Sequence, residues 1–230
     1  MPPPYDKSKV TAVIPAKDEA EGLAKIILEV KKYAGEIIVV DGHSKDNTKQ
    51  IVEKLGATYL LDNGKGRGAA VKLGIIKSNN EIIVLVDADG SHEISDIPLL
   101  VTPLLKKQAD LVISSRRTGG SSDMRMNFDG LLRSAGSDLL VMLTNHKFDS
   151  HLTDILYSFR AVNKSKFRSA KLTSNGFSIE QEMVIKFLEK KYKIKEIPSR
   201  EKARAWGESK LKTIGGIELF LKLIYDLYLR

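Results

Sequence analysis

The first 115 residues alternate short apolar runs with longer amphipathic stretches. The apolar runs are four or five residues long, rich in Val and Ile, and bounded by polar or turn-forming residues, as is typical of strands buried in a parallel sheet. Strands are predicted over 10–14, 36–40, 58–61, 82–86 and 111–114. Helical spacing between them predicts helices over 21–33, 46–55, 68–77 and 98–107. This alternation indicates βαβ units around a central sheet.

The pattern is less regular after residue 115. A polar loop is predicted over 115–130, and a charged loop over 199–210. The intervening elements are predicted as two helices and a strand, over 131–143, 177–191 and 194–198. Apolar residues then recur at helical spacing over 211–230. We therefore expect a single α/β domain over 1–230, with a mostly parallel sheet flanked by helices and an irregular C-terminal third.

Composition narrows the class of protein. A chain of 230 residues that is 42% hydrophobic can bury one sizeable core. It has no Cys, which excludes disulfides, Cys-ligated zinc, iron–sulfur clusters and thiol nucleophiles. Its longest aliphatic runs fall far short of the roughly 20 residues that span a bilayer, and its N-terminus has no apolar signal region. We expect a cytoplasmic protein, or one at the cytoplasmic face of a membrane that it does not cross.

The charge is concentrated near the C-terminus. The net charge is +8, and residues 186–230 hold 12 Lys/Arg against 6 Asp/Glu. Such an excess attracts polyanions. No nucleic-acid-binding motif accompanies it, so nucleic acid is not an expected partner. Anionic lipid headgroups, phosphorylated substrates and a simply solvated basic surface remain open.

Acidic side chains follow the predicted strands. Asp41 comes after the second strand, and Asp87 and Asp89 come after the apolar run 82–86. Ligands of open α/β sheets bind at the carboxyl ends of the strands. Two residues spaced i, i+2 in extended chain project to the same side, where their carboxylates repel each other unless a cation lies between them. Oxygen ligands favour Mg²⁺ or Mn²⁺, and Ser91 and His92 are near enough to be further ligands or to support the ligands. The same residues are also common in ordinary turns.

Four motifs occur in a fixed order in the first half of the chain: VIPAKDEAEGL (13–23), IVVDGHSKDNT (38–48), GKGRGAA (64–70) and VLVDADGSH (84–92). This set resembles the nucleotide-diphosphosugar transferase domain of family 2 glycosyltransferases. Four further motifs look most like the polyprenyl-phosphate (dolichyl-phosphate) mannose or glucose synthase branch: SSRRTGG (114–120), LTDILYSFRAV (152–162), GFSIEQEM (176–183) and RAWGESKL (204–211). The resemblance implies a GT-A-like fold, in which 10–117 binds the nucleotide sugar, 118–210 lies on the acceptor side and 211–230 forms an amphipathic helix. It also implies that Asp154, Phe159 and Arg160 fall in the segment that walls the acceptor site.

The resemblance also implies roles for residues that bind the donor, a UDP- or GDP-sugar. The base and ribose pocket would be lined by Pro15, Ala16, Glu19 and Asp41. The loop that borders the donor would contribute Lys65 and Arg67.

The remaining implied roles concern the diphosphate. Asp87 and Asp89 match the Asp-x-Asp pair that holds the metal and the diphosphate, with Ser91 where the branch often has Gln. Basic side chains near the phosphates, and so catalytic together with Asp89, would be Arg116, Arg204 and Lys210. A metal and basic groups fit this chemistry, because the leaving diphosphate builds negative charge.

The acceptor decides whether a base is needed. A polyprenyl phosphate is largely a dianion at pH 7, because its second pKa is about 6, and it needs no general base. A saccharide hydroxyl needs a carboxylate within reach, for which Asp154, Glu180 and Glu182 are the candidates. The expected reaction is therefore hexose transfer to a polyprenyl phosphate, with inversion. The alternative is transfer to a soluble phosphorylated or saccharide acceptor.

Two other classes of protein share this architecture but fit the sequence less well. A sugar nucleotidyltransferase would carry a Gly-rich loop with Arg after the first strand, where this chain has Pro15-Ala16-Lys17-Asp18. A binding protein without activity would not need Asp87, Asp89, Arg204 and Lys210 together. The basic amphipathic segment 211–230 has two open readings, which are packing on the domain or a second subunit, and contact with an anionic membrane.

Overall fold

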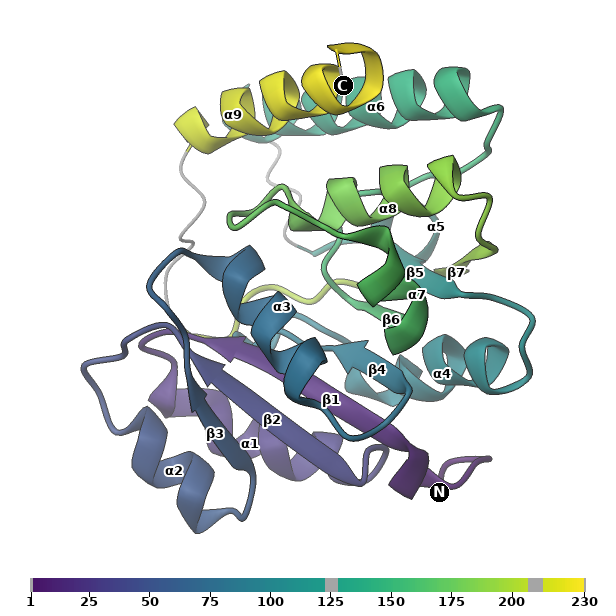
Figure 1. Ribbon diagram of the computed structural model, residues 1–230. Coiled ribbons are helices and arrows are strands. Elements are labelled where there is room, and N and C mark those ends of the chain that lie inside the picture. The colour runs from purple at the N-terminus through teal and green to yellow at the C-terminus, as the bar shows by residue number, and fades with distance from the viewer. Residues whose placement is uncertain (1, 123–127, 207–212, 230) are drawn as a thin grey trace.

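The computed structural model describes residues 2–122, 128–206 and 213–229. In these residues one sheet of seven strands is formed, in the order β3-β2-β1-β4-β6-β5-β7 (Figure 1). The strands are β1 (Val10–Ala16), β2 (Glu36–Asp41), β3 (Thr58–Leu61), β4 (Ile82–Leu85), β5 (Leu111–Ser115), β6 (Arg160–Asn163) and β7 (Ile194–Pro198). The sheet thus joins segments from both halves of the chain.

Six of the seven strands point the same way. Strand β1 pairs in parallel with β2 and β4, β2 with β3, and β5 with β7, whereas β6 is antiparallel to both β4 and β5. The expected mostly parallel sheet is confirmed. Its consequence is that the carboxyl ends of β1, β2, β4, β5 and β7 lie along one edge, where the loop that precedes β6 also arrives.

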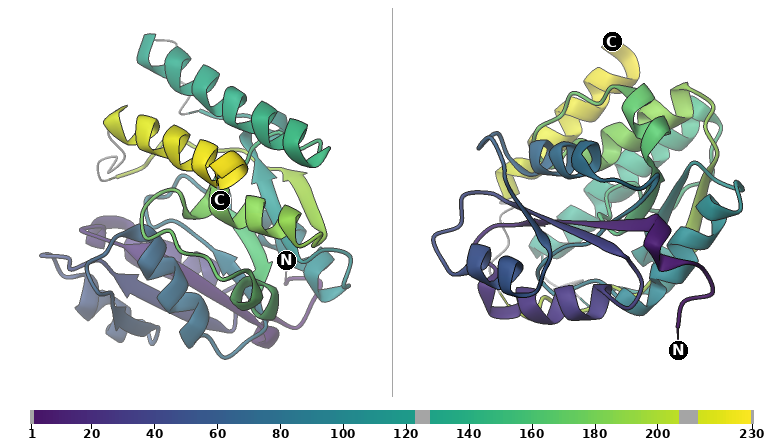
Figure 2. Two further views of the ribbon diagram at one scale, coloured as in Figure 1. Left: turned by 45° about the horizontal axis from the view of Figure 1, so that its top comes forward. Right: turned by 60° about the horizontal axis from the view of Figure 1, so that its bottom comes forward.

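Helices cover both faces of the sheet (Figures 1 and 2). One face packs against α1 (Ala20–Val30), α2 (Thr48–Lys54) and α4 (Ile97–Leu105). The other packs against α3 (Arg67–Lys77), α7 (Lys164–Ala170) and α8 (Ile179–Glu189). Beyond α8 lie α6 (Phe128–Phe148), α9 (Thr213–Ile224) and the terminal turn η3 (Tyr225–Leu229). Short helical turns complete the described chain: η1 (Lys7–Lys9), η2 (Ile94–Asp96) and α5 (Arg116–Gly119).

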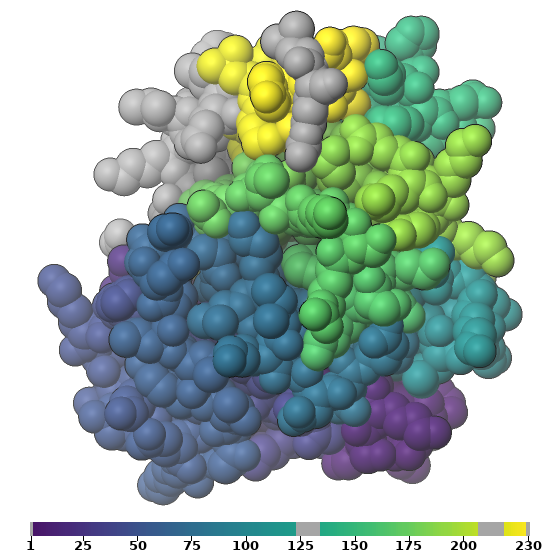
Figure 3. Space-filling model, in the orientation of Figure 1, coloured from purple at the N-terminus to yellow at the C-terminus, as the bar shows by residue number. Residues whose placement is uncertain are grey.

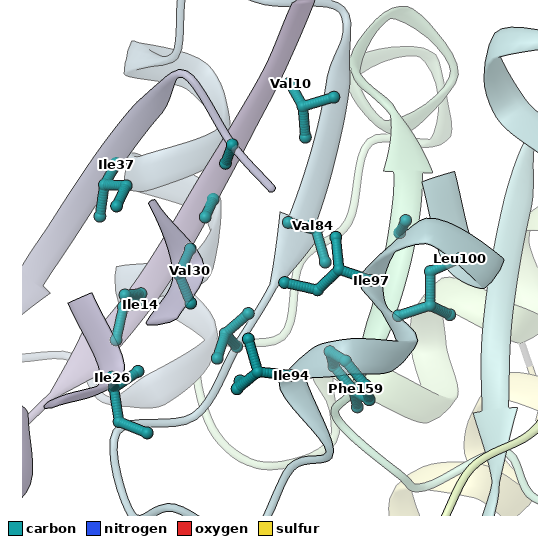
Figure 4. Packing of buried hydrophobic residues seen from close by; sticks show 14 of the residues in the cluster. Val10, Ile14, Ile26, Val30, Ile37, Val84, Ile94, Ile97, Leu100 and Phe159 are labelled. Atoms are coloured by element: carbon teal, nitrogen blue, oxygen red, sulfur yellow. The ribbon is translucent and has the colours of Figure 1, made fainter. Parts of the chain in front are cut away.

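Strand periodicity divides the core into two clusters. In β4, Val84 faces the α1/α4 side while Ile83 faces the α3/α8 side, and the other central strands alternate in the same way. Figure 4 shows Val84 with Ile97 and Leu100 of α4 in the first cluster. Each such fully buried aliphatic side chain contributes roughly 1.5–3 kcal/mol relative to exposure. The sheet is therefore a rigid support for the loops at its edge.

Besides the short helical turns, the strand β6 and the helix α7 were not foreseen from the sequence. Strand β6 is only four residues long and begins with Arg160, a charged residue that is fully buried. The Arg160 guanidinium donates to the carbonyl oxygens of Tyr157, Glu180 and Ile155, which compensates the burial. A second difference is that α6 begins at Phe128, inside the predicted 115–130 loop, and ends five residues later than predicted. None of the helices in the described residues is long and apolar enough to cross a membrane.

Candidate active site

The loops after β1 and β2 are tied together at the edge of the sheet. Ser44 donates to Asp41 Oδ1 through its backbone N–H at 2.9 Å and its hydroxyl at 2.5 Å, and the Tyr59 hydroxyl donates to Asp41 Oδ2 at 2.7 Å. The backbone N–H of Asp18 donates to Ser44 Oγ at 2.8 Å, which links the two loops. Asp41 thus shapes the loop itself. Its predicted contact with base or ribose stays a prediction, as do those of Pro15 and Ala16 at the end of β1.

Asp87 follows β4, and each of its two carboxylate oxygens contacts another side chain. Its Oδ1 is 2.7 Å from Arg67 Nη2, and its Oδ2 accepts a hydrogen bond of 2.6 Å from Ser158 Oγ. His92 lies on the same side, with Nε2 3.5 Å from Oδ2. Burial alone would raise the pKa of Asp87, but the Arg67 guanidinium outweighs it and holds that pKa below its ordinary value. Asp87 is therefore an anion at neutral pH.

Asp89 is held by its own turn and by a segment far along the chain. The backbone N–H and hydroxyl of Ser91 donate to Asp89 Oδ1 at 2.9 and 2.7 Å. Arg204 Nη2 lies 2.9 Å from Asp89 Oδ2, and Arg204 Nη1 lies 3.7 Å from Glu19 Oε1. Arg204 therefore bridges two predicted donor-site carboxylates. Lys210 lies outside the described residues.

Residues 202–206 run along the Asp87–Ser91 turn, and we call them the 202–206 segment. The backbone N–H of Lys202 donates to the Ser91 carbonyl at 2.8 Å, and that of Ala205 donates to the Asp89 carbonyl at 3.1 Å. Trp206 Nε1 donates to the Ala88 carbonyl at 2.8 Å. The indole packs where Gly22 and Gly90 leave space: a Cβ on Gly22 would lie 1.8 Å from Trp206 Cε2. The segment is thus fastened to the Asp-x-Asp turn.

The predicted donor loop reaches the same place through Arg67. Gly66 has a φ of 111°, in the region open to glycine, and Gly68 packs directly on the 174–176 backbone. This arrangement puts Arg67 at the N-terminus of α3, where its Nε contacts Glu180 Oε1 at 3.1 Å while its Nη2 contacts Asp87. Lys65 is exposed on the loop. Of the two predicted donor-loop cations, Arg67 contacts the Asp-x-Asp pair.

Arg116 lies after β5 and forms a bidentate pair with Asp154. Its Nε and Nη2 lie 2.7 and 3.2 Å from the two Asp154 oxygens, and its guanidinium lies 4.9 Å from the centre of the Tyr157 ring. Burial would raise the pKa of Asp154, but Arg116 lowers it below its ordinary value. The Arg116 side chain is 28% exposed. Its remaining nitrogen, Nη1, lies 3.5 Å from Glu201 Oε1, so Arg116 is paired with two carboxylates.

The three carboxylates proposed as general bases are all engaged within the protein. Asp154 also accepts from the backbone N–H groups of Leu156 and Tyr157. Glu180 pairs with Arg67, and Glu182 accepts from the backbone and side chain of Thr173. All three are at most 3% exposed. These contacts make them structural acceptors and argue against a role as base.

Two residues expected to line the acceptor side are instead in the core. Phe159 and Arg160 are 0% exposed, because Phe159 packs in the cluster with α4 and Arg160 holds carbonyl groups beneath the 154–158 loop. The predicted acceptor wall is wrong at these two positions. What the sequence missed is Ser158, which contacts Asp87. Its only signal in the sequence was its place in the 152–162 motif.

The donor atoms fit a magnesium or manganese ion shared with a substrate. Asp87 and Asp89 present hard anionic oxygens from one turn, and each is paired with a guanidinium whose place a metal can take. In the described ranges no group of three or more His, Cys, Asp or Glu side chains could hold a metal alone. This matches Mg²⁺ chemistry, in which one or two carboxylates are completed by phosphates and water. The residues fit a metal that arrives with a diphosphate.

The sequence is similar to those of two named proteins over almost its whole length. Glycosyltransferase AglJ from Haloferax volcanii is 29% identical over 97% of this chain and 72% of its own length. Dolichol-phosphate mannosyltransferase from Pyrococcus furiosus is 30% identical over 95% of this chain. The chain spans 63% of the length of that second relative.

Solved structures share the fold. A mycobacterial protein superposes with a TM-score of 0.77 at 19% identity, over 96% of this chain and 75% of its own. Glucosyl-3-phosphoglycerate synthase from Mycobacterium tuberculosis, in complex with Mn²⁺, UDP and phosphoglyceric acid, superposes with a TM-score of 0.74 at 17% identity, over 96% and 79%. The expected GT-A-like fold is confirmed. The model of "Glycosyl transferase family 2" matches residues 11–170, so the chain belongs to that family and is a glycosyltransferase.

Proposed function

We propose that this protein transfers a hexose from a UDP- or GDP-sugar to a polyprenyl phosphate, with inversion and with Mg²⁺ or Mn²⁺. The donor side rests on Asp87 and Asp89, whose oxygens fit a metal shared with the diphosphate. The metal would neutralise charge on the leaving diphosphate. Arg204, beside Asp89, and Lys210 would stabilise the same charge.

The observation that carries the choice of acceptor is the pairing of every candidate base. Asp154, Glu180 and Glu182 are buried and bonded within the protein, so none of them is placed to take a proton from a hydroxyl. A phosphate monoester is already ionised and requires no base. Arg116, 28% exposed at the same edge, would meet such an acceptor by exchanging the 3.5 Å contact between its Nη1 and Glu201 for one with the phosphate. The site thus suits an anionic nucleophile.

A surface on the outer helices suits a lipid acceptor. On α9 and η3, Leu221, Tyr225 and Tyr228 are 63%, 49% and 49% exposed and lie at helical spacing on one stripe. On α6, Met142 is 59% exposed. Figure 3 shows α9 and α6 together at the surface. Lys147 lies 5.2 Å from the Tyr228 ring, so a basic and an aromatic group lie together there, a combination that membrane-interface helices use. We call Leu221, Tyr225 and Tyr228 the outer apolar stripe.

Two relatives point in different directions for the acceptor. The name of the Pyrococcus furiosus relative, at 30% identity, contains dolichol phosphate. The Mycobacterium tuberculosis structure contains phosphoglyceric acid, but at 17% identity it supports a fold alone. We therefore favour the lipid phosphate and treat a soluble phosphorylated acceptor as the competing outcome. The proposed division of labour keeps 10–117 for the donor, 118–210 for the acceptor and 211–230 for the membrane surface.

The test is a radiolabelled transfer assay with Mg²⁺ or Mn²⁺. UDP-glucose, UDP-GlcNAc and GDP-mannose are each offered with a polyprenyl phosphate, with phosphoglyceric acid, or with no acceptor. Label in the organic phase that is lost in Asp89→Asn and kept in Asp149→Asn, an exposed Asp away from the site, supports the proposal. Label transferred only to the aqueous acceptor would overturn the lipid acceptor and keep the transferase.

A further inference from the structure

The orientation of Asp87 depends on a residue from the loop before β6. Ser158 Oγ lies 2.6 Å from Asp87 Oδ2 although the two residues are 71 positions apart in the chain. Because the carboxylate is an acceptor only, the hydroxyl must donate. One of the two Asp87 oxygens is therefore occupied by a hydrogen bond from within the protein.

The direction of the Ser158 proton is set in turn by His92. The backbone N–H of Asp87 donates to His92 Nδ1 at 3.2 Å, so Nδ1 carries a lone pair and the ring proton is on Nε2. His92 Nε2 lies 3.1 Å from Ser158 Oγ and donates to it. The ring is held by stacking on Phe159, with centroids 4.6 Å apart, and by an edge contact with Tyr157 at 5.2 Å. A rigid relay thus runs from His92 through Ser158 to Asp87.

The second oxygen of Asp87, Oδ1, is not part of this relay and faces the Arg67 guanidinium. Oδ1 and Arg67 Nη2 are 2.7 Å apart and form an ion pair. Within the described residues neither atom has a hydrogen-bond partner of regular geometry. Arg67 itself is tethered through Nε to Glu180. We propose that Ser158, oriented by His92, is a positioning residue that holds the Asp87 carboxylate in the orientation in which Oδ1 faces Arg67 and would be taken over by the metal when the diphosphate binds. This inference rests on the proposed function, since it assigns a support to that same site.

The effect of a residue that orients a metal ligand can be measured as a change in metal affinity. Removing a group that orients a metal ligand typically weakens metal binding 10–100-fold. Ser158→Ala deletes only the hydroxyl of a half-buried side chain and introduces no larger group. Ser158→Thr keeps the hydroxyl. Ser165→Ala is a matched control, because its hydroxyl bonds Asn163 at the opposite end of β6.

The experiment measures Mn²⁺ binding by electron paramagnetic resonance in the presence of UDP or GDP, without acceptor or turnover. We expect the Mn²⁺ Kd to rise about tenfold or more in Ser158→Ala, and to stay near the wild-type value in Ser158→Thr and Ser165→Ala. Thermal melting of each variant without metal checks that it is folded. In transfer assays, saturating Mn²⁺ is expected to restore kcat in Ser158→Ala, which a general structural defect would not allow.

The outcomes separate this inference from the proposed function. If the wild-type protein binds no Mn²⁺ with either nucleotide, the metal-dependent function fails. If the wild-type protein binds Mn²⁺ and folded Ser158→Ala binds it equally well, the positioning role alone is overturned.

Discussion

The indole N–H of Trp206 donates a 2.8 Å hydrogen bond to the carbonyl oxygen of Ala88, the residue between the two aspartates of the Asp-x-Asp pair. Arg204, two residues earlier, contacts Asp89 at 2.9 Å. The 202–206 segment thus places a cation against the carboxylate that is proposed to bind a metal. The protein has a single tryptophan, so its emission reports on this segment alone.

We expect Mg²⁺ with a nucleoside diphosphate to change the emission of Trp206. A metal at Asp89 competes with Arg204 for the carboxylate, and the freed guanidinium can pair with the diphosphate, which shifts the segment that carries the indole. A fluorescence titration measures this, with the nucleotide in EDTA as control. Unchanged emission at ligand concentrations that calorimetry shows to be saturating would contradict the exchange.

Arg204→Gln should tighten the binding of metal alone but slow sugar transfer. Losing a positive group beside Asp89 should tighten Mn²⁺ binding a few-fold in the absence of nucleotide, because the metal no longer displaces a guanidinium. Losing it from the diphosphate should lower kcat/KM about 100-fold. Lys202→Gln is the matched control, since Lys202 lies in the same segment but pairs with Glu93 at the surface. A parallel fall in metal affinity and in transfer would instead indicate a general structural role.

The sequence was enough to locate the parallel strands, because the periodicity of their apolar residues and the turn residues between them are local features. The positions of Asp41, Asp87 and Arg116 at strand ends followed directly, since parallel strands end at one edge. The contacts between distant segments did not follow. Arg160 starts a strand that local propensity does not favour, and its burial depends on three carbonyl groups supplied by tertiary structure.

The same limit applies to side-chain partners. Asp154 and Glu180 looked like available bases because a sequence does not show that Arg116 and Arg67 lie beside them. Trp206 fits between Gly22 and Gly90, positions separated from it by more than a hundred residues. Pairings of this kind are fixed by the packing of the whole domain and not by the local pattern.

Gly22→Ala tests the packing of Trp206. The new Cβ would lie 1.8 Å from the indole, so the 202–206 segment must move, at a cost of about 1–3 kcal/mol in the free energy of unfolding. Gly136→Ala is the matched control on α6, where a Cβ meets nothing within 4 Å, and we expect it to stabilise by roughly 0.5–1 kcal/mol. Denaturant unfolding and Trp206 emission measure both variants. Equal effects of the two substitutions would show that the indole does not occupy this place.

Leu221→Glu tests the outer apolar stripe. Leu221 is 63% exposed on the protein surface. If α9 lies on an anionic membrane, replacing a Leu that inserts into the membrane by a negative charge should weaken liposome binding about tenfold or more. Leu99→Glu is the matched control, because Leu99 is 52% exposed on α4, across the sheet from α9. Flotation with anionic vesicles measures the difference. Equal binding by both variants would place the membrane contact elsewhere or exclude it.

Asp154→Asn separates a structural carboxylate from a catalytic base. Because Arg116 depresses the pKa of Asp154 in the folded protein, its contribution to stability is fully present above the unfolded-state value of 3.8 and is lost as the pH falls through the lower, folded-state pKa. The variant should therefore unfold more easily at pH 7, by about 2–4 kcal/mol, and show a smaller further loss of stability in acid than the wild-type protein.

Urea unfolding between pH 2.5 and 7 measures both effects, with the exposed Asp149→Asn as control. A structural role also predicts that Asp154→Asn retains transfer to a phosphate acceptor at temperatures where it is folded, although with a higher acceptor KM because Arg116 loses its fixed orientation. A variant that keeps its stability but loses kcat by several orders of magnitude would identify Asp154 as a base. That result would favour a hydroxyl acceptor over a phosphate.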